Sequence, residues 1–550
     1  MTHRKNLGFS SVMVLLFMFV ALTVMLGLSG MAMQSLKRSD NEAKYMSSFQ
    51  VAQSVLEHQT NLSYLASKTN DGDLVAGTYN HDALAASLTP GATGYATVAP
   101  TADATRGWVT AYGTFGGKTR SVRMLIATRD VSIWNNAVFT GTGAAGQSIN
   151  GNVDIRGSVH ILGEGEPYSD LNGNGQRDKA ETFTDSNGNG VWDPGEPFVD
   201  ANGDAVWNSA EPYNDTNFNG IYDPPLTTTD LNSSFGGTAH IGNNYYNMPA
   251  ALRGIIPSPM VINGLETLGA EVRAKHGKIS INGSATVGSS TNPVSTMKGL
   301  LDGTFVSDGW TGNQGSASVF SENGHTNGYD LNNVGIQFPI INGIGAPEYT
   351  DGGGTVWTTH GSFFDSEAMV IPINSINSST PAFAYADLKG NSIVYTPANG
   401  ATPATLTVNG MVKVNGSLAL DMDNDDLRYQ GKGTMFATQD IYIGSNLLPA
   451  AGLQFPTQAV LGLVAGRNMG LATGGGDAQI SMAGAFYAQG TIVSAKQNHI
   501  LGTFVANYFD MGKNVPSIYQ VPALRKNLPP GMPGDQLYVT LKVKSWRSRQ

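Results

Sequence analysis

The pattern of apolar and polar positions first marks out one long amino-terminal helix. Residues 9–33 contain no charged side chain. At about 1.5 Å per residue, a helix of this length spans the roughly 30 Å apolar layer of a bilayer. Apolar residues then recur among polar ones, without proline, to about Ser67. The pattern therefore predicts one extended helix over residues 9–67, apolar in its first part and amphipathic in its second.

Beyond the helix, the pattern changes to short alternating runs that predict strands. Residues 108–129 read as two strands joined at Gly116 and Gly117, and they place a small sheet within residues 68–135. The final run, LYVTLKVKSWRSR, alternates Val, Leu and Trp in the same way. We expect this strand, in a carboxyl-terminal segment over 512–550, to return to the sheet and complete it.

The middle of the chain predicts a solenoid. Short strands with Gly or Asn corners recur in runs such as NVDIRGSVHI, TLTVNGMVKVNGSLAL and AQISMAGAFYAQGTIVSA. Because these corners carry no tight hairpin signal, they favour a right-handed parallel β-helix over a sandwich. We place the β-helix at residues 136–163 and 227–511. The predicted fold class is mainly β with a long amino-terminal α-helix: an α+β base that carries a large parallel β-helix with an insertion.

The insertion, residues 164–226, contains four acidic loops whose first aspartates, Asp170, Asp185, Asp200 and Asp215, are fifteen residues apart. The loops DLNGNGQRDKAE and DSNGNGVWDPGE have oxygen ligands at positions 1, 3, 5, 9 and 12 and glycine at position 6. This is the pattern of an EF-hand calcium loop, in which position 7 adds a main-chain carbonyl. The predicted Ca²⁺ ligands are Asp170, Asn172, Asn174, Gln176, Asp178 and Glu181; Asp185, Asn187, Asn189, Val191, Asp193 and Glu196; Asp200, Asn202, Asp204, Val206, Asn208 and Glu211; and Asp215, Asn217, Asn219, Ile221 and Asp223.

The third and fourth loops depart from the pattern. Ala205 replaces the glycine of the third loop, where a positive φ strains a residue with a side chain. Leu226 stands where the fourth loop needs its glutamate, so weak binding or a capping role is expected there. Only three residues separate successive loops, too few for flanking helices. We expect the loops to stack directly through recurrent aromatic residues: Phe183, Trp192, Phe198, Trp207, Tyr213 and Tyr222.

Over about sixty residues this array resembles the tandem calcium loops of thrombospondin type 3 repeats, a resemblance that implies a rigid structural module and not a sensor. The alternative is a string of Asx turns in a disordered acidic loop. Thirteen acidic and two basic residues lie between Glu164 and Asp223, whereas the whole chain has a net charge of −10. The chain has no cysteine, so calcium would substitute for disulfides as a cross-link.

The amino terminus adds a processing signal. A basic leader, MTHRKNLG, ends at Gly8 and is followed by Phe9 and the apolar helix. This arrangement resembles a type IV prepilin, a family in which a dedicated peptidase cuts after the glycine, here Gly8, so that Phe9 becomes the first residue. The first 130 residues also resemble the PilX type of pilus assembly proteins, which implies that the predicted α+β base is pilin-like. Met13 stands where pilins usually carry glutamate, which suggests a subunit at the filament tip. The alternatives are cleavage near Ala32 and a plain single-span anchor.

The remaining motifs do not identify a catalytic site. An acidic cluster, DMDNDD, contains Asp421, Asp423, Asp425 and Asp426 but lacks the loop glycine and the last glutamate, so we interpret it as a solvated turn. Basic residues gather near the carboxyl end with two aromatic neighbours, Tyr519 and Trp546. They predict either a phosphate-binding face or a strand edge blunted by cations. These residues are Lys513, Arg525, Lys526, Lys542, Lys544, Arg547 and Arg549.

Together these features predict a noncatalytic minor pilin, expected at the tip of a type IV pilus or pseudopilus. Its calcium-stabilised β-helix would serve adhesion, DNA capture or assembly priming. The expected partners are other pilins, the prepilin peptidase, the bacterial inner membrane before assembly, and a surface glycan or DNA once the protein is displayed at the cell surface. The alternative is a membrane-anchored extracellular β-helix that acts on polysaccharides, or an adhesin unrelated to pili.

Overall fold

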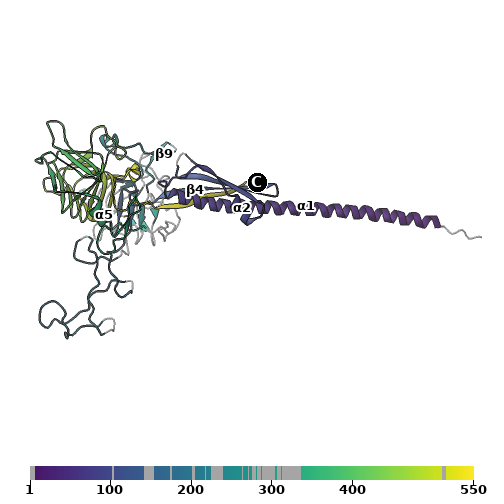
Figure 1. Ribbon diagram of the computed structural model, residues 1–550, viewed down its shortest axis with the longest axis horizontal. Helices are drawn as coiled ribbons and strands as arrows, with labels where there is room; N and C mark the ends of the chain where they lie inside the picture. The colour runs from purple at the N-terminus through teal and green to yellow at the C-terminus, as the bar shows by residue number, and fades with distance from the viewer. Residues whose placement is uncertain are drawn as a thin grey trace, which may run out of the picture. The chain divides into compact units, whose positions relative to one another are not determined.

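The chain folds into two compact units, one formed by residues 1–131 with 537–550 and the other by residues 132–536. Figure 1 shows the computed structural model. It describes residues 7–101, 104–141, 154–173, 176–200, 205–216, 218–224, 240–262, 264–270, 272–274, 280–281, 286–287, 304–305, 311–312, 336–510 and 516–549.

The first unit is a long helix on an antiparallel sheet. Helix α1 covers Leu7–Ser67, and a short helix, α2, covers Asp82–Leu88. The sheet contains, in spatial order, β1 (Gly77–Asn80), β2 (Thr93–Pro100), β3 (Arg106–Phe115), β4 (Lys118–Asp130) and β33 (Val539–Arg549). Both predictions for this unit are confirmed: β3 and β4 form a hairpin around Gly116 and Gly117, and the last strand pairs with β4.

Helix α1 has an exposed apolar half and a packed amphipathic half. An eighteen-residue window within Val12–Ser67 has a mean hydropathy of 2.6, so α1 is long and apolar enough to cross a membrane. Near its other end, Val51, Ala52, Val55 and Leu56 are fully buried against the sheet. The two halves of one helix therefore meet two environments, as the change of pattern along the sequence predicts.

A close contact between α1 and β3 depends on Gly113. A Cβ atom on this residue would lie 2.3 Å from the Ser48 carbonyl oxygen and 2.5 Å from the Ala52 nitrogen. Both distances are far shorter than a normal contact, and both neighbours are main-chain atoms of a packed helix. Only glycine permits this approach of helix and sheet.

We expect Gly113→Ala to destabilise the first unit by about 1–3 kcal/mol, because the helix must move away from β3 to admit the methyl group. Thermal unfolding of the detergent-solubilised protein measures this change. Gly117→Ala is a useful comparison, since its Cβ meets no atom within 4 Å although its φ is +74°. Equal stability of Gly113→Ala and the wild type would contradict the proposed close packing.

The second unit is a parallel β-helix whose strands stack in three columns. The first column contains, in stacking order, β18 (Met369–Ile371), β22 (Ala404–Val414), β25 (Lys432–Ala437), β28 (Val460–Ala465), β30 (Ser481–Ser494), β31 (His499–Asp510), β5 (Val138–Thr140), β7 (Val159–Ile161), β11 (Val272–Ala274) and β14 (Thr304–Phe305). The second contains β19 (Ser375–Asn377), β23 (Leu418–Asp421), β26 (Ile441–Ile443), β29 (Met469–Leu471) and the last parts of β30 and β31. The third contains the first part of β22, β24 (Asp426–Gln430), β27 (Asn446–Pro449), the first parts of β30 and β31, β32 (Ser517–Tyr519), β6 (Asp154–Arg156), β8 (His240–Gly242) and β13 (Thr286–Val287).

Stacking of like residues in register builds the core of the β-helix. One buried ladder runs through Val412, Met435, Leu463, Phe486, Phe504, Val138 and Val159. The sequence NVDIRGSVHI forms β6 and β7 on different columns, with Gly157 at φ +140° between them. The strands thus pair in parallel around a glycine corner, as predicted, and form a closed, β-helix-like sheet, while its right-handedness stays a prediction.

The order of the coils differs from simple growth along the chain. The last long strand, β31, pairs with the first strand, β5, through Phe504 and Val138. The chain therefore enters and leaves the β-helix through adjacent coils, and later coils extend the stack on both sides. This order explains how one chain leaves the sheet of the first unit after β4 and returns to it as β33.

A few elements lie outside the three columns. Strands β20 (Phe383–Ala386) and β21 (Ser392–Thr396) form an antiparallel hairpin that continues into β22, which the glycine-corner pattern did not predict. The others are the pairs β9 (Met260–Ile262) with β10 (Leu265–Thr267), β12 (Ser280–Ile281) with β15 (Thr311–Gly312), and β16 (Tyr349–Thr350) with β17 (Val356–Trp357), and the helices α4 (Ala250–Arg253), α5 (His360–Glu367) and η2 (Pro522–Asn527).

Candidate functional site

The four acidic loops, called loops 1 to 4 from Asp170, Asp185, Asp200 and Asp215, fold back on one another as two antiparallel pairs. A β-bridge joins Tyr168, before loop 1, to Tyr213, before loop 4. A second bridge joins Phe183, before loop 2, to Phe198, before loop 3. Figure 1 shows these segments as loops without helices. The short spacers therefore form a ladder instead of a linear stack.

In loops 2, 3 and 4, the first aspartate is turned inward and accepts a hydrogen bond from the sixth residue of its loop. Asp185 Oδ2 accepts a hydrogen bond from the Gly190 N–H (2.7 Å), and Asp215 Oδ2 accepts the equivalent bond from Gly220 (2.7 Å). These glycines have φ of +77° and +76°. The Gly190 N–H and neighbouring amides lower the pKa of Asp185, because they stabilise its charged form. In loop 3 the Ala205 N–H donates the same bond to Asp200 (2.9 Å). Ala205 has a φ of +60°, the positive φ that is expected to strain a residue with a side chain.

Side chains predicted as ligands within one loop come together. The Asn172 amide lies 2.6 Å from Asp178 Oδ2, the Asn189 amide 2.8 Å from Asp193 Oδ2, and the Asn219 amide 3.1 Å from Asp223 Oδ2. The predicted ligands Asn174, Asn202, Asp204 and Asn217, together with Leu226, lie outside the described residues. In loops 1, 2 and 4, members of the predicted ligand sets therefore hydrogen-bond to one another, while their binding of an ion stays a prediction.

Two of the glutamates contact a loop other than the one that they end in the sequence motif. Glu196 accepts from the Ser186 and Asp193 N–H groups of its own loop 2 (2.7 and 3.0 Å). Glu211, however, accepts from Leu171 and Asp178 of loop 1 (2.7 and 3.0 Å).

Glu181, in turn, accepts from Asn208 of loop 3 (3.0 Å). The sequence-based grouping of Glu181 with loop 1 and Glu211 with loop 3 is therefore wrong. The antiparallel fold-back brings the end of each of these loops against the other.

Aromatic side chains hold the ladder together in two clusters. Trp192 and Trp207 stack at 5.2 Å, with Phe183 and Phe198 edge-on to them. The predicted recurrent aromatic residues do pack on one another, although across loops rather than along a line. The second cluster contains Tyr213, Tyr222 and two residues that the sequence reasoning missed, Tyr168 and Arg177, whose guanidinium lies over both of the other tyrosine rings.

The donor set of the array fits a hard cation. Each loop offers carboxylate, carboxamide and main-chain oxygens, and neither sulfur nor imidazole, which is the chemistry that calcium prefers. In the described residues, no three His, Cys, Asp or Glu side chains gather closely enough to hold an ion by themselves. An ion in these loops would therefore depend on asparagine and main-chain oxygens as well as on the carboxylates.

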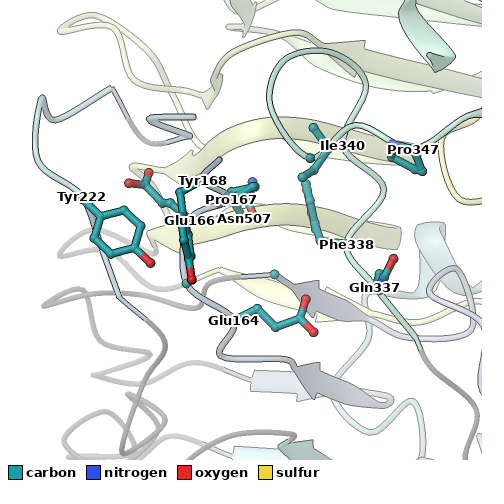
Figure 2. A pocket seen from close by; sticks show the side chains of 13 residues that line it. Glu164, Glu166, Pro167, Tyr168, Tyr222, Gln337, Phe338, Ile340, Pro347 and Asn507 are labelled. Atoms are coloured by element: carbon teal, nitrogen blue, oxygen red, sulfur yellow. The ribbon is translucent and has the colours of Figure 1, made fainter. Parts of the chain in front are cut away.

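A cleft lies where the array joins the β-helix. It has a volume of about 370 Å³ and is lined by both apolar and polar side chains. Figure 2 shows Tyr222 and Glu166 on one side of the cleft and Phe338 and Ile340 on the other. Burial raises the pKa of Glu166, although the N–H groups of Asp223 and Thr216 stabilise its charged form.

The acidic DMDNDD cluster has a structural role. The DMDNDD cluster follows β23 as a turn with Asp423 and Asn424 at φ of +55° and +71°, and Asp426 forms an ion pair with Arg428. These contacts support the interpretation as a turn.

The carboxyl-terminal basic residues also favour the simpler of their two interpretations. Lys542, Lys544, Arg547 and Arg549 lie on β33, an edge strand of the sheet. Tyr519, predicted as an aromatic neighbour, is buried in the β-helix core, and Lys513 lies outside the described residues. The strand edge blunted by cations is therefore favoured over a phosphate-binding face.

The residues of the processing motif lie on α1. Gly8 and Phe9 belong to its first turns, and Met13, at the position where pilins usually carry glutamate, is about half exposed. The apolar helix leads into an antiparallel sheet, and the carboxyl-terminal strand completes this sheet.

The fold resembles that of a solved pilin. The competence-associated pilin ComZ from Thermus thermophilus matches with a TM-score of 0.52 at 17% sequence identity. The match covers 92% of this chain and 97% of that one, so it is not confined to the base. No model of a protein family matches the chain, and no curated protein matches it in sequence. The likeness establishes the fold: mainly β, with a long amino-terminal helix and a pilin-like architecture.

Proposed function

We propose that the protein is a noncatalytic minor component of a type IV pilus or pseudopilus. The main support for this proposal is the structure of the first unit. There a helix long enough to span a membrane packs on an antiparallel sheet, which the carboxyl-terminal strand completes. The likeness to a solved pilin over most of both chains supports this proposal. The exposed apolar half of α1 would pack among other pilins, after a period in the inner membrane.

We place the subunit at the filament tip. In the prepilin family, the glutamate at the fifth mature position neutralises the terminal amine of a neighbouring subunit, and here Met13 occupies that position. A charged amine in lipid is costly without such a partner. A subunit at the tip has no further subunit to engage, so it does not need the carboxylate.

The β-helix would then be displayed at the cell surface for adhesion, DNA capture or assembly priming, with a surface glycan or DNA as its ligand. Because the solved neighbour is described as competence-associated, it supports DNA capture among these roles.

We further propose that the acidic array binds Ca²⁺ as a rigid structural module. The inward first aspartates, the converging asparagines and the glutamates that bridge two main-chain amides support this assignment. The residues named above as predicted ligands would hold the ions, and the bound ions would neutralise carboxylates that otherwise repel one another. Calcium would stabilise the array and would not take part in chemistry.

Mass spectrometry of the mature protein tests the pilin assignment. We expect cleavage after Gly8 and a methylated Phe9 at the amino terminus, followed by assembly into filaments. Gly8→Val should block cleavage and leave the protein in the inner membrane. A mature chain that begins at Met1, or beyond Ala32, would sink the proposal.

A further inference from the structure

We infer that loop 4 is a complete calcium site, and that its missing glutamate is supplied by Glu166, at the opposite end of the array. The inference rests on the proposed binding of calcium to these loops. It assigns a ligand that lies 49 residues before Asp215 and replaces the expectation, drawn from Leu226, of a weak or merely capping loop.

The hydrogen bonds of Glu166 repeat those of the other glutamates. Its two carboxylate oxygens accept from the N–H groups of Thr216 and Asp223 (2.7 and 3.1 Å), the second and ninth residues of loop 4. Glu211 and Glu196 accept from the same two positions of loops 1 and 2 at matching distances. Glu166 therefore stands where a loop of this class places its bidentate ligand.

The main-chain hydrogen bond of Glu166 also has an equivalent at the other three glutamates. The Glu166 N–H donates to the Asp223 carbonyl oxygen (2.9 Å). In loop 2 the Glu196 N–H donates to Asp193 (3.0 Å), and across loops 1 and 3 the other two glutamates make the same bond to the ninth residue. The position of Glu166 thus follows from the backbone and not from one side-chain rotamer.

The sequence provides independent support. A glutamate stands four residues before the first aspartate of every loop, in EPYSD, ETFTD, EPFVD and EPYND. The repeating unit therefore begins with glutamate, and Glu166 is its first member. With this phase, four glutamates match four loops and none is missing.

The burial of Glu166 favours a cation beside its carboxylate. The residue is only 2% exposed, and in the described part of the chain no lysine, arginine or histidine forms an ion pair with it. A buried carboxylate is costly without a compensating charge. The Thr216 hydroxyl also donates to Glu166 Oε1 (3.0 Å), so the carboxylate accepts three hydrogen bonds and keeps one of its about four lone-pair sites, on Oε2, for an ion. Bidentate ligation would replace the bond from the Thr216 hydroxyl.

A calcium ion here would fasten the array to the β-helix. Glu166 follows β7 closely, and the Glu164 N–H donates to the Gly141 carbonyl oxygen (3.1 Å). On the other side, the Tyr508 hydroxyl of β31 donates to Asp223 Oδ2 (3.0 Å), and the Arg467 guanidinium lies 4.5 Å from the Phe218 ring centroid. The ion would join the two ends of the insertion at the point where both contact the body.

Counting bound calcium in the full-length protein, by equilibrium dialysis against ⁴⁵Ca²⁺ in detergent, tests the inference. We expect four ions for the wild type, three for Glu166→Gln and four for the control Glu164→Gln, an acidic neighbour on the same segment. Asp215→Asn should also bind three, and the double variant Glu166→Gln with Asp215→Asn still three, because both residues serve one site. Circular dichroism verifies that each variant is folded.

The outcomes separate this inference from the proposals on which it rests. Four ions bound by Glu166→Gln would overturn the role of Glu166, and three bound by both the wild type and Asp215→Asn would show that loop 4 binds none. A wild type that binds no calcium would overturn the calcium assignment of the whole array. The processing of Gly8 and Phe9 would still decide the pilin assignment by itself.

Discussion

Removal of calcium should open the acidic array while leaving the β-helix folded. The array holds thirteen acidic and two basic residues between Glu164 and Asp223, and its glutamates are brought against other acidic loops. Without bound cations these carboxylates repel one another, and the two aromatic clusters are the main apolar contacts that oppose the repulsion. The β-helix has its own buried ladder of apolar residues and does not share this dependence.

The expected effect is large because the sites add up. Extracellular calcium loops bind with a Kd of about 10⁻⁴ to 10⁻³ M. At about ten times its Kd, each bound ion stabilises the folded array by about 1.4 kcal/mol. Four such sites contribute about 5–6 kcal/mol, which is comparable to the whole stability of a small domain.

Tryptophan fluorescence and limited proteolysis, each with millimolar calcium and with chelator, measure this opening. We expect the stacked pair Trp192 and Trp207 to separate, and cleavage to concentrate in residues 164–226. The double variant Trp192→Phe with Trp207→Phe should remove most of the fluorescence change, since the other five of the seven tryptophans lie outside the array. Identical digestion patterns with calcium and with chelator would remove the calcium assignment.

Glu211 contacts loop 1 and Glu181 contacts loop 3, so replacing either glutamate should weaken calcium binding in the loop that it contacts. Glu211→Gln should lower the affinity of loop 1, and Glu181→Gln that of loop 3, by on the order of 100-fold, or about 2.7 kcal/mol. The physical reason is the loss of a charged bidentate ligand that is almost completely buried, at 3% exposure for Glu211.

Hydrogen exchange read by mass spectrometry resolves which loop is affected. In Glu211→Gln we expect the amides of Leu171 and Asp178 to lose protection, whereas in Glu181→Gln the Asn208 amide should lose it. Glu196→Gln provides the matched control, because Glu196 serves its own loop 2. Loss of protection in loop 1 on changing Glu181 would restore the simple pairing along the sequence and refute the exchange.

These expectations show where local sequence suffices and where it does not. The first aspartate, the asparagines and the glycine of each loop lie within nine residues, so their convergence follows from one turn of the chain. The turns at Gly116 and Gly157 are likewise local: Gly116 and Gly117 form the tight hairpin between β3 and β4, and Gly157 forms the corner between β6 and β7.

The partners of the glutamates depend on how loops fold back on one another, and spacing along the chain does not specify that. Glu211 and Glu181 exchange loops because β-bridges at Tyr168 and Phe183 align the spacers antiparallel. A signal for Glu166 was nevertheless present: glutamate precedes each first aspartate by four residues. A motif window that starts at aspartate omits it. The antiparallel hairpin of β20 and β21 shows the same limit, since its pairing interrupts an otherwise uniform pattern of parallel coils.

The pairing of β31 with β5 sets a time order for building the body. As the chain is synthesised, β5 becomes available early, but its neighbour at Phe504 follows more than three hundred residues later. Until then one edge of the first coil has open hydrogen-bonding groups, which makes it a place for mispairing with other chains. The protein therefore cannot finish folding coil by coil during synthesis. Its slowest step is expected to be the pairing of β31 with β5, a contact of very high sequence separation.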